Sequence, residues 1–267
     1  MAWHADNVSS PTIWSSGQYE AVARRIAPIA TEVVDAIERR LPVREAMLVD
    51  LACGTGNAAL VAAARGARVT AVDLTPELIA IGARGAKAAG RSVAWVTADA
   101  SDTGLPTASF DAAVSNMGII FVEPVAMVAE ISRLLKPGGA VGFSSWVRDP
   151  ANPFFTPIVE VLCPPPAPGY SPDQWGEPDT ITARLATDFD DIDIQRGWNT
   201  WRFESVAAGM HFLTSESPLH VDVFSRVEAE QSDRLRAAFQ SALQTHADVD
   251  GRVSYKAPYM VVTARRT

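Results

Sequence analysis

A carboxylate and two glycines with ligand-binding spacing stand in one short stretch, at Asp50, Gly54 and Gly56. The apolar run 47–51 around the carboxylate is typical of a central parallel strand, which is buried on both faces. The glycines let the chain turn sharply and let a ligand approach the backbone, and the free amides of a following helix would face that ligand. Together with Ala59 the pattern also satisfies the dinucleotide fingerprint of dehydrogenases, so this turn alone leaves the ligand open.

Further polar residues follow the next predicted strands. Asp73 ends the strand 68–72 and lies about 20 residues beyond the first glycine, where such folds place an acid that binds ribose hydroxyls. The others come after the next two strands: Asp99 after 93–97, and Ser115-Asn116 after 110–114. Because the carboxyl ends of parallel strands meet at one edge of a sheet, we expect these side chains to share a ligand-binding edge.

The wider pattern alternates strands with helices, which favours a parallel α/β sheet. Thr75-Pro76-Glu77 predicts a helix start with a capping hydroxyl, and Lys136-Pro137-Gly138-Gly139 predicts the stop of a helix over 124–135. An earlier helical pattern opens at 16–20, and we expect Pro28 to interrupt it. The remaining expected elements are strands at 140–146, 192–196 and 255–264, and helices at 206–213 and 233–244.

These residues together resemble the class I S-adenosylmethionine-dependent methyltransferases, in the subgroup called type 11. The stretches that carry the resemblance are Asp50–Gly56, Asp73, Asp99-Ala100 ahead of Leu105-Pro106, Phe110-Asp111 and Glu130–Gly139. The resemblance implies a Rossmann-like α/β fold: a seven-stranded, mostly parallel sheet with helices on both faces, an antiparallel last strand and a lid-like insertion. It also implies methyl transfer from S-adenosyl-L-methionine, which leaves S-adenosyl-L-homocysteine as product.

The resemblance implies roles for particular residues at the cofactor. Gly54 and Gly56 would admit the methionine portion, with Asp50 acting on its ammonium group directly or through water. The other expected contacts are Asp73 with the ribose diol, Leu74 beside the adenine, Asp99 and the Ala100 amide with the adenine edge, and Ser115 or Asn116 along the methionine arm. Taken singly, Asp73 and Asp99 are also ordinary helix-cap or turn residues.

Aromatic residues outside the motif region are candidates for the acceptor pocket. In the resembled family the N-terminal helix covers the cofactor, so Trp14 and Tyr19 are candidates to touch cofactor or acceptor. An apolar segment over 147–190 is expected to fold over the ligand edge as a lid. The candidate pocket walls are Met117, Trp146, Phe154, Phe155 and Trp175, each with simple core packing as the alternative.

No catalytic base is assigned. Methyl transfer is an in-line displacement that removes the sulfonium charge, so alignment and desolvation can supply much of the rate acceleration. If the acceptor must lose a proton, His211 is the first candidate and His220 the second.

Composition restricts the partners. The chain has 267 residues and a formal net charge of -8, which disfavours a surface that coats phosphates. Its cysteines, Cys53 and Cys163, are isolated, which fits a reducing cytoplasm and gives no metal-spaced pair. There is no signal-like start and no apolar stretch long enough to span a bilayer. Abundant arginine and alanine suggest a bacterial source with a GC-rich genome.

We expect one methyltransferase domain over 1–267, with N-terminal covering helices at 1–45, a cofactor-binding core at 46–146, the lid at 147–190 and C-terminal strands and helices at 191–267. The motifs of DNA-methylating enzymes and the acidic pair of magnesium-dependent ones are missing. The expected activity is therefore metal-independent methylation of a small, partly apolar molecule. An NAD(P)-dependent oxidoreductase and a non-catalytic cofactor-binding protein remain as alternatives.

Overall fold

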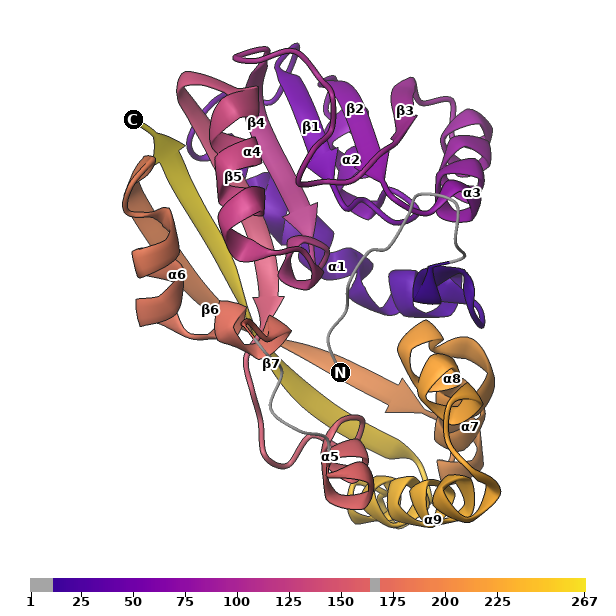
Figure 1. Ribbon diagram of the computed structural model, residues 1–267. Helices are drawn as coiled ribbons and strands as arrows, with labels where there is room; N and C mark the ends of the chain where they lie inside the picture. Colours follow the sequence, from indigo (N-terminus) through magenta and orange to yellow (C-terminus); the bar gives the residue numbers. More distant parts are fainter. Residues whose placement is uncertain (1–11, 164–168) are drawn as a thin grey trace.

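The computed structural model describes residues 12–163 and 169–267, which form a seven-stranded sheet flanked by helices (Figure 1). The strand order is β3-β2-β1-β4-β5-β7-β6. Strands β1 to β5 are mutually parallel, and β7 is antiparallel to both of its neighbours, as expected. The strands are β1 (Met47–Leu51), β2 (Arg68–Asp73), β3 (Val93–Thr97), β4 (Phe110–Asn116), β5 (Leu135–Trp146), β6 (Phe189–Phe203) and β7 (Val253–Arg266).

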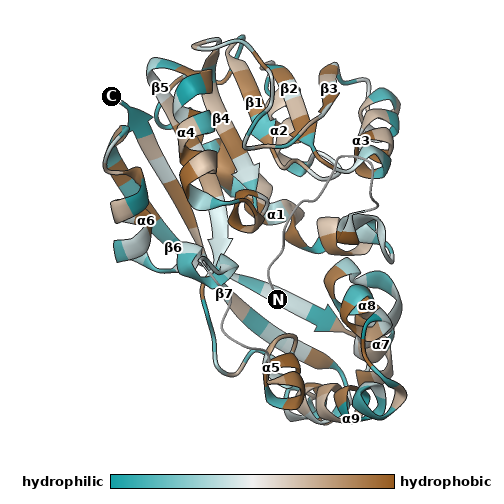
Figure 2. Cartoon of the chain, in the orientation of Figure 1, coloured by the Kyte–Doolittle hydropathy of each residue, from teal (hydrophilic) through white to brown (hydrophobic). Residues whose placement is uncertain are grey.

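Helices cover both faces of the sheet, so its central strands are apolar on both sides. Along β1, Leu48 packs into one core and Val49 into the other, and Figure 2 shows the central strands and the inner helix faces as mostly apolar. The first core contains α1 (Tyr19–Glu38) and α2 (Asn57–Ala64). The second core contains α4 (Pro124–Leu134) and α6 (Pro178–Leu185). Helix α3 (Pro76–Ala88) packs beside β3 at the sheet edge.

The last two strands extend past the parallel core and carry a second group of helices (Figure 1). These are α5 (Thr156–Leu162), α7 (Val206–His211), α8 (Pro218–Ser225) and α9 (Ala229–Thr245), with a π-helical segment, η4 (Phe212–Glu216), between α7 and α8. The short strand expected at 192–196 was wrong in length, because charged residues on the exposed edge of β6 hide the strand pattern. Its far end is nevertheless anchored by buried Trp201 and Phe203.

Three local expectations were also wrong. Helix α1 continues through Pro28, because its apolar side packs against the sheet and compensates for one missing hydrogen bond. Thr75 precedes α3, but its hydroxyl bonds the Thr12 hydroxyl at 2.7 Å and does not cap the helix. Helix α4 ends at Leu134, next to the predicted stop, but the strand expected to begin at 140 already begins at Leu135, because buried Leu135 pairs with Phe110.

In its described parts, the segment 147–190 packs against two regions of the molecule. Its helix α6 packs against α4 and β6, whereas α5 packs against α9. Among the described residues, no helix has the length and apolar character needed to cross a membrane.

Candidate active site

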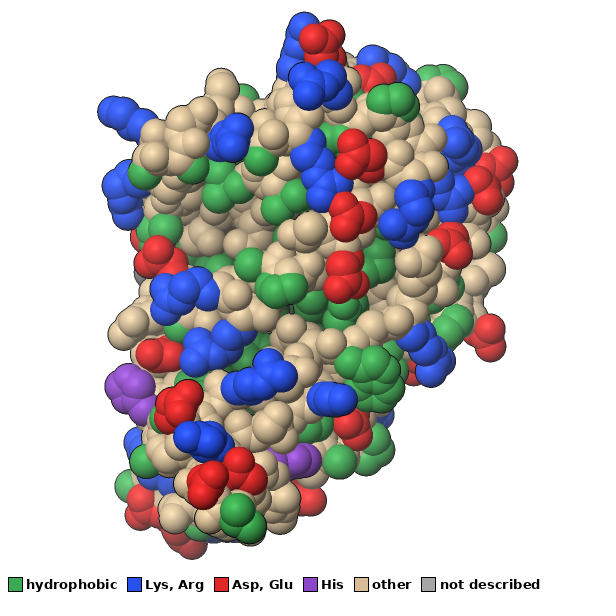
Figure 3. All heavy atoms as spheres, turned by 180° about the vertical axis from the view of Figure 1, so that it is seen from behind, with side chains coloured by type: hydrophobic (Ala, Val, Ile, Leu, Met, Phe, Trp, Pro, Cys, Tyr) green, Lys and Arg blue, Asp and Glu red, His purple; other side chains and the backbone are tan. Residues whose placement is uncertain are grey.

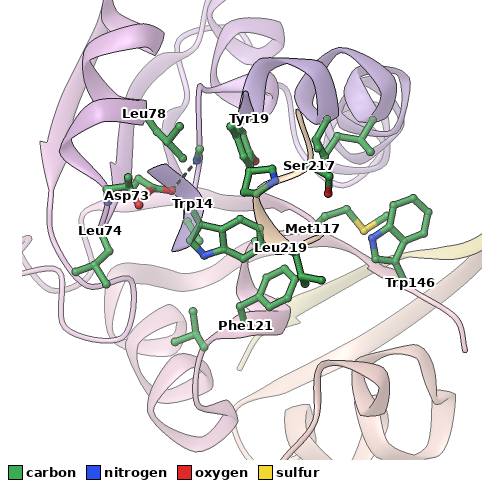
Figure 4. Close-up of a pocket in the computed structure, with 18 of the residues that line it drawn as sticks. Trp14, Tyr19, Asp73, Leu74, Leu78, Met117, Phe121, Trp146, Ser217 and Leu219 are labelled. Atoms are coloured by element: carbon green, nitrogen blue, oxygen red, sulfur yellow. Dashed lines mark hydrogen bonds between the residues drawn. The ribbon is translucent and has the colours of Figure 1, made fainter. Parts of the chain in front are cut away.

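A cavity of about 350 Å³ lies at the carboxyl ends of β1, β2 and β4, between the sheet, the start of α1 and the start of α8 (Figure 4). We call one part of it the glycine-turn end, lined by Gly54, Asp73, Leu74, Leu78, Asp99 and Ala100. We call the other part the aromatic chamber, lined by Met117, Trp146, Phe154, Trp201, Phe212, Ser217 and His220. Figure 4 shows Trp14 and Tyr19 between the two parts.

At two positions of the glycine turn, glycine is the only residue that fits without strain. Gly54 has φ +57° and Gly56 has φ +84°, both in the left-handed region that side chains disfavour. A Cβ on Gly54 would stand 2.5 Å from the Tyr19 hydroxyl, and one on Gly56 would stand 2.4 Å from the Trp95 ring. The turn therefore brings bare backbone to the cavity under Tyr19, while Gly56 itself is not part of the cavity wall.

Asp73 is held by backbone amides at the end of β2. Its carboxylate accepts hydrogen bonds from Gly54 N at 2.7 Å and from Thr75 N at 2.9 Å. A dashed line in Figure 4 marks a hydrogen bond at Asp73. The side chain is 8% exposed and lines the cavity. Burial raises the pKa of Asp73 above its ordinary value, and the two amides oppose that shift. The carboxylate is thus oriented, with lone pairs left for a ligand.

Asp50 lies behind the turn and is more deeply buried. Its Oδ2 accepts from Ala59 N at 2.8 Å, but its Oδ1 has no hydrogen-bond partner. Burial raises the pKa of Asp50 to about 8, with a further upward contribution from the nearby Asp73 charge. A buried carboxylate with a free oxygen calls for a cationic or donating partner, although Asp50 does not itself reach the cavity wall.

Asp99 and Ala100 reach the cavity at its far edge, beyond β3. The Asp99 carboxylate accepts from the Ser101 amide at 2.8 Å and from the Ser101 hydroxyl at 2.7 Å, both through Oδ1. This is the ordinary turn geometry of aspartate, and it leaves the second oxygen for a ligand.

The aromatic chamber is built from distant parts of the chain. The Phe154 and Trp201 rings lie 5.2 Å apart, and Trp201 lies 5.6 Å from Phe212. Trp146 approaches the same cluster at 6.2 Å from Trp201. Phe155 lines the cavity too, but is 44% exposed. The chamber therefore offers flat apolar walls to a ligand.

Comparisons with known proteins agree on one family. A type 11 methyltransferase-domain model matches residues 49–143. An uncharacterized protein of Mycobacterium tuberculosis is 31% identical over 191 residues, covering 69% of this chain and 68% of the relative. The aklanonic acid methyltransferase DauC of a Streptomyces species is 29% identical, covering 64% of this chain and 79% of that protein.

The chain belongs to the S-adenosylmethionine-dependent methyltransferases. A solved structure of Haemonchus contortus phosphoethanolamine N-methyltransferase 2 with S-adenosyl-L-methionine shares the fold, with a TM-score of 0.53 and 18% identity over 88% of this chain and 52% of that one. Members of this family take the transferred methyl group from S-adenosylmethionine.

The residues of this methyltransferase fit that cofactor. S-adenosylmethionine carries a cationic ammonium group, a diol and a flat base. The glycine-turn end provides an oriented carboxylate at Asp73 and apolar side chains at Leu74 and Leu78, with the unpaired oxygen of Asp50 behind the turn. A Cβ at Gly54 would overlap the Tyr19 ring, so glycine at this position lets Tyr19 lie directly against the turn.

Several expected site residues of the methyltransferase lie away from the cavity. The Ser115 hydroxyl donates to Leu51 O at 2.7 Å, and the Asn116 side chain bonds Ile26 O and the Ser144 hydroxyl, so both tie β4 to its neighbours. Trp175 is fully buried, edge-on to Phe143, and outside the cavity wall.

The two candidate histidines occupy different environments. The His211 side chain is 64% exposed at the end of α7 and does not line the cavity. His220 is 4% exposed, lines the aromatic chamber, and bonds the Ser217 hydroxyl at 2.7 Å and Phe154 O at 2.8 Å. Burial lowers the pKa of His220 to about 4.

Some residues of the cavity wall were not predicted from the sequence. Ser217 was missed, although serine followed by proline is an ordinary helix start and α8 begins there. Trp201 and Phe212 were missed because each belongs to an element whose extent was misjudged. Ala52 was missed as well: it lines the cavity with φ +50°, a conformation usual for glycine.

Proposed function

We propose that this enzyme methylates a small, partly apolar molecule without help from a metal ion. The observation that carries the proposal is the continuity of the cavity, which runs from the Asp73 carboxylate into the aromatic chamber. A cofactor at the glycine-turn end would point its reactive group toward that chamber, where apolar rings favour an apolar acceptor.

The cofactor contacts are part of the proposal. Asp73 would accept hydrogen bonds from the ribose hydroxyls, and Leu74 would pack beside the adenine, with Asp99 and the Ala100 amide at the edge of the base. Gly54 would let the methionine portion lie against the backbone under Tyr19. The neighbouring Asp50 carboxylate would favour the methionine ammonium through its unpaired oxygen.

The protein's own contribution is positioning and exclusion of water. S-adenosylmethionine supplies the methyl group on a sulfonium centre, and an acceptor lone pair must approach opposite the sulfur. Met117 and Trp146 would hold the acceptor in that direction and keep solvent from the reacting atoms. In the part of the chain that the structure describes, no group of three or more His, Cys, Asp or Glu side chains is arranged to hold a metal ion.

Two further observations support a small-molecule acceptor. The name of the relative DauC gives aklanonic acid as that protein's methyl acceptor. On the face drawn in Figure 3, basic and acidic side chains of the described residues are interspersed, whereas surfaces that bind nucleic acid gather basic ones.

Calorimetry and a transfer assay test the proposal together. S-adenosylmethionine and S-adenosylhomocysteine should bind, while NADH and NADPH should not. Radiolabelled S-adenosylmethionine is then incubated with the enzyme and small phenols, naphthols and quinols, with duplex DNA and tRNA in parallel. Label transfer to one or more of the small molecules supports the proposal, and transfer only to a nucleic acid would overturn the acceptor class.

A further inference from the structure

One hydrogen-bond chain crosses the wall of the aromatic chamber, from Ser217 through His220 to the backbone of Phe154. Ser217 is 5% exposed and His220 is 4% exposed, yet both line the cavity. In the view of Figure 4, Ser217 lies between Tyr19 and Trp146, close to Met117. A polar group in this position meets whatever ligand occupies the chamber.

The direction of each hydrogen bond in this chain follows from elementary valence. The Phe154 carbonyl only accepts, so His220 Nε2, at 2.8 Å from it, must carry the hydrogen. Burial lowers the pKa of His220 to about 4, so near neutral pH the ring carries a single hydrogen and Nδ1 is bare. Nδ1 therefore accepts, and the Ser217 hydroxyl, 2.7 Å away, must donate to it.

Because its hydrogen is donated to His220, the Ser217 hydroxyl can only accept further hydrogen bonds. Its only hydrogen points at His220, so the oxygen presents lone pairs alone to the chamber. An O–H or N–H group of a ligand satisfies those lone pairs, whereas an ether or carbonyl oxygen meets another acceptor and loses its hydrogen bond to water.

We infer that Ser217 Oγ is the group that recognises the methyl acceptor, and that it selects molecules that carry a hydroxyl or amino hydrogen on an apolar ring. His220 is a positioning residue, because it acts by holding the serine hydrogen. This inference rests on the proposed function and deepens it by naming the acceptor class. It also gives a reason for product release: O-methylation moves the methyl group from the sulfonium to the acceptor oxygen and gives the hydroxyl proton to solvent, so the ether product has no hydrogen for Ser217 to bind.

Two matched probes separate this selection from simple apolar binding. 2-Naphthol and 2-methoxynaphthalene share one ring system and differ in the donor hydrogen. We would titrate each into enzyme saturated with S-adenosylhomocysteine and measure binding by calorimetry. The wild-type enzyme should bind 2-naphthol about tenfold more tightly.

Variants then test the two residues. Ser217→Ala should bring the ratio of the two affinities close to one, and Ser217→Thr, which keeps a hydroxyl, should retain the preference. His220→Phe should also lower the ratio, because the freed serine hydrogen can donate to the ether. Ser225→Ala is the control, since that serine lies on the same helix, bonds Asp222 O and is outside the cavity wall.

Each outcome decides a different claim. Equal binding of the two probes by the wild-type enzyme, or a preference that survives Ser217→Ala, overturns the role of Ser217 and leaves the proposed function standing. Binding of neither probe overturns the apolar acceptor chamber, and the role of Ser217 with it. If Ser217→Ala no longer binds S-adenosylhomocysteine, the ratios measured for Ser217→Thr and His220→Phe decide the question.

Discussion

The two parts of the cavity are built in different ways. The glycine-turn end is formed by residues between 52 and 101, where Asp73 and Asp99 stand at or just after the end of a parallel strand and are oriented by backbone amides. The aromatic chamber draws on residues from 117 to 257, brought together by the long β6 and β7 strands and the helices packed on them. One end is fixed by a local backbone pattern, and the other by how distant segments pack.

This difference predicts which cavity residues must be retained for the cofactor geometry and which can be replaced. Residues at the glycine-turn end are constrained by backbone conformation and by hydrogen bonds from backbone amides of the parallel core, so the cofactor geometry is set within that core. The aromatic rings of the chamber are constrained by side-chain packing, so their identities can change to suit an acceptor.

The largest expected effect comes from the turn that joins the two parts. Gly118 follows β4, and a Cβ there would stand 2.2 Å from Ala52 O and 2.7 Å from Ala52 Cβ. Because backbone must move to relieve this clash, Gly118→Ala should lower the free energy of unfolding by about 2 to 3 kcal/mol. Urea denaturation of the variant and the wild type measures this difference in the free energy of unfolding. Gly85→Ala, with no atoms within 4 Å of its Cβ, should be neutral or stabilising, and equal losses in both variants would refute the steric argument.

A second change should weaken only the glycine-turn end. Asp73→Ala removes the carboxylate that faces the cavity and should weaken S-adenosylhomocysteine binding by about 1 to 3 kcal/mol in calorimetry. The exposed Asp102→Ala serves as a control. Binding of 2-naphthol, measured without cofactor, should not change. Unchanged cofactor affinity would remove Asp73 from the proposed site, and a matching loss of naphthol binding would show that the two parts are not independent.

A third test uses pH to examine the carboxylate behind the turn. The pKa of Asp50 rises from its ordinary value of 3.8 to about 8 on folding. The stability that its protonated form gives the fold is therefore present below about pH 4 and is lost as pH rises through 8. Asp50→Asn has no such loss, because its amide oxygen still accepts from Ala59 N. The advantage of the variant over the wild type should therefore grow by about 1 to 3 kcal/mol between pH 6 and pH 9.

Urea denaturation at the two pH values checks this, with Asp111→Asn as the opposite case. Hydrogen bonds from Lys136 and Met47 lower the pKa of Asp111, and its replacement should not stabilise the protein at either pH. Parallel pH profiles for the wild type and Asp50→Asn would show that Asp50 finds a partner in the folded enzyme.

The smallest expected effect is a gain in the free energy of unfolding. Ala52 lines the cavity at φ +50°, where glycine is less strained. Ala52→Gly should raise the free energy of unfolding by about 0.5 to 1 kcal/mol. Ala83→Gly, in the interior of α3, should instead cost about 1 kcal/mol. A loss of stability in Ala52→Gly would show that the alanine methyl group contributes packing worth more than the strain.

Sequence reasoning predicted the parallel core well, because its signals are local. Strands β1 and β3 have the predicted limits, and β2 runs through Asp73 as expected. The Glu130–Gly139 stretch also proved informative for a structural reason: buried Glu130 accepts from the Thr103 amide and hydroxyl and pairs with Arg133, which fixes the loop before β4.

The acceptor side was harder to predict, because its residues meet only in three dimensions. Trp175 and Phe154 look alike in the sequence. Trp175 is packed under Arg184 in the second core, whereas Phe154 faces the chamber. His211 and His220 have similar sequence settings, but one is exposed and the other is held between a hydroxyl and a carbonyl. No periodic pattern distinguishes these cases.

Three indole rings, Trp14, Trp146 and Trp201, belong to the cavity wall along its length. Indole emission shifts in colour and intensity when water around the ring is replaced by an apolar or charged neighbour. The protein thus contains its own optical reporter, and Trp14 stands at the junction while the other two stand in the chamber. Single replacements of these tryptophans by phenylalanine would assign each spectral change to one stretch of the cavity, without any attached dye.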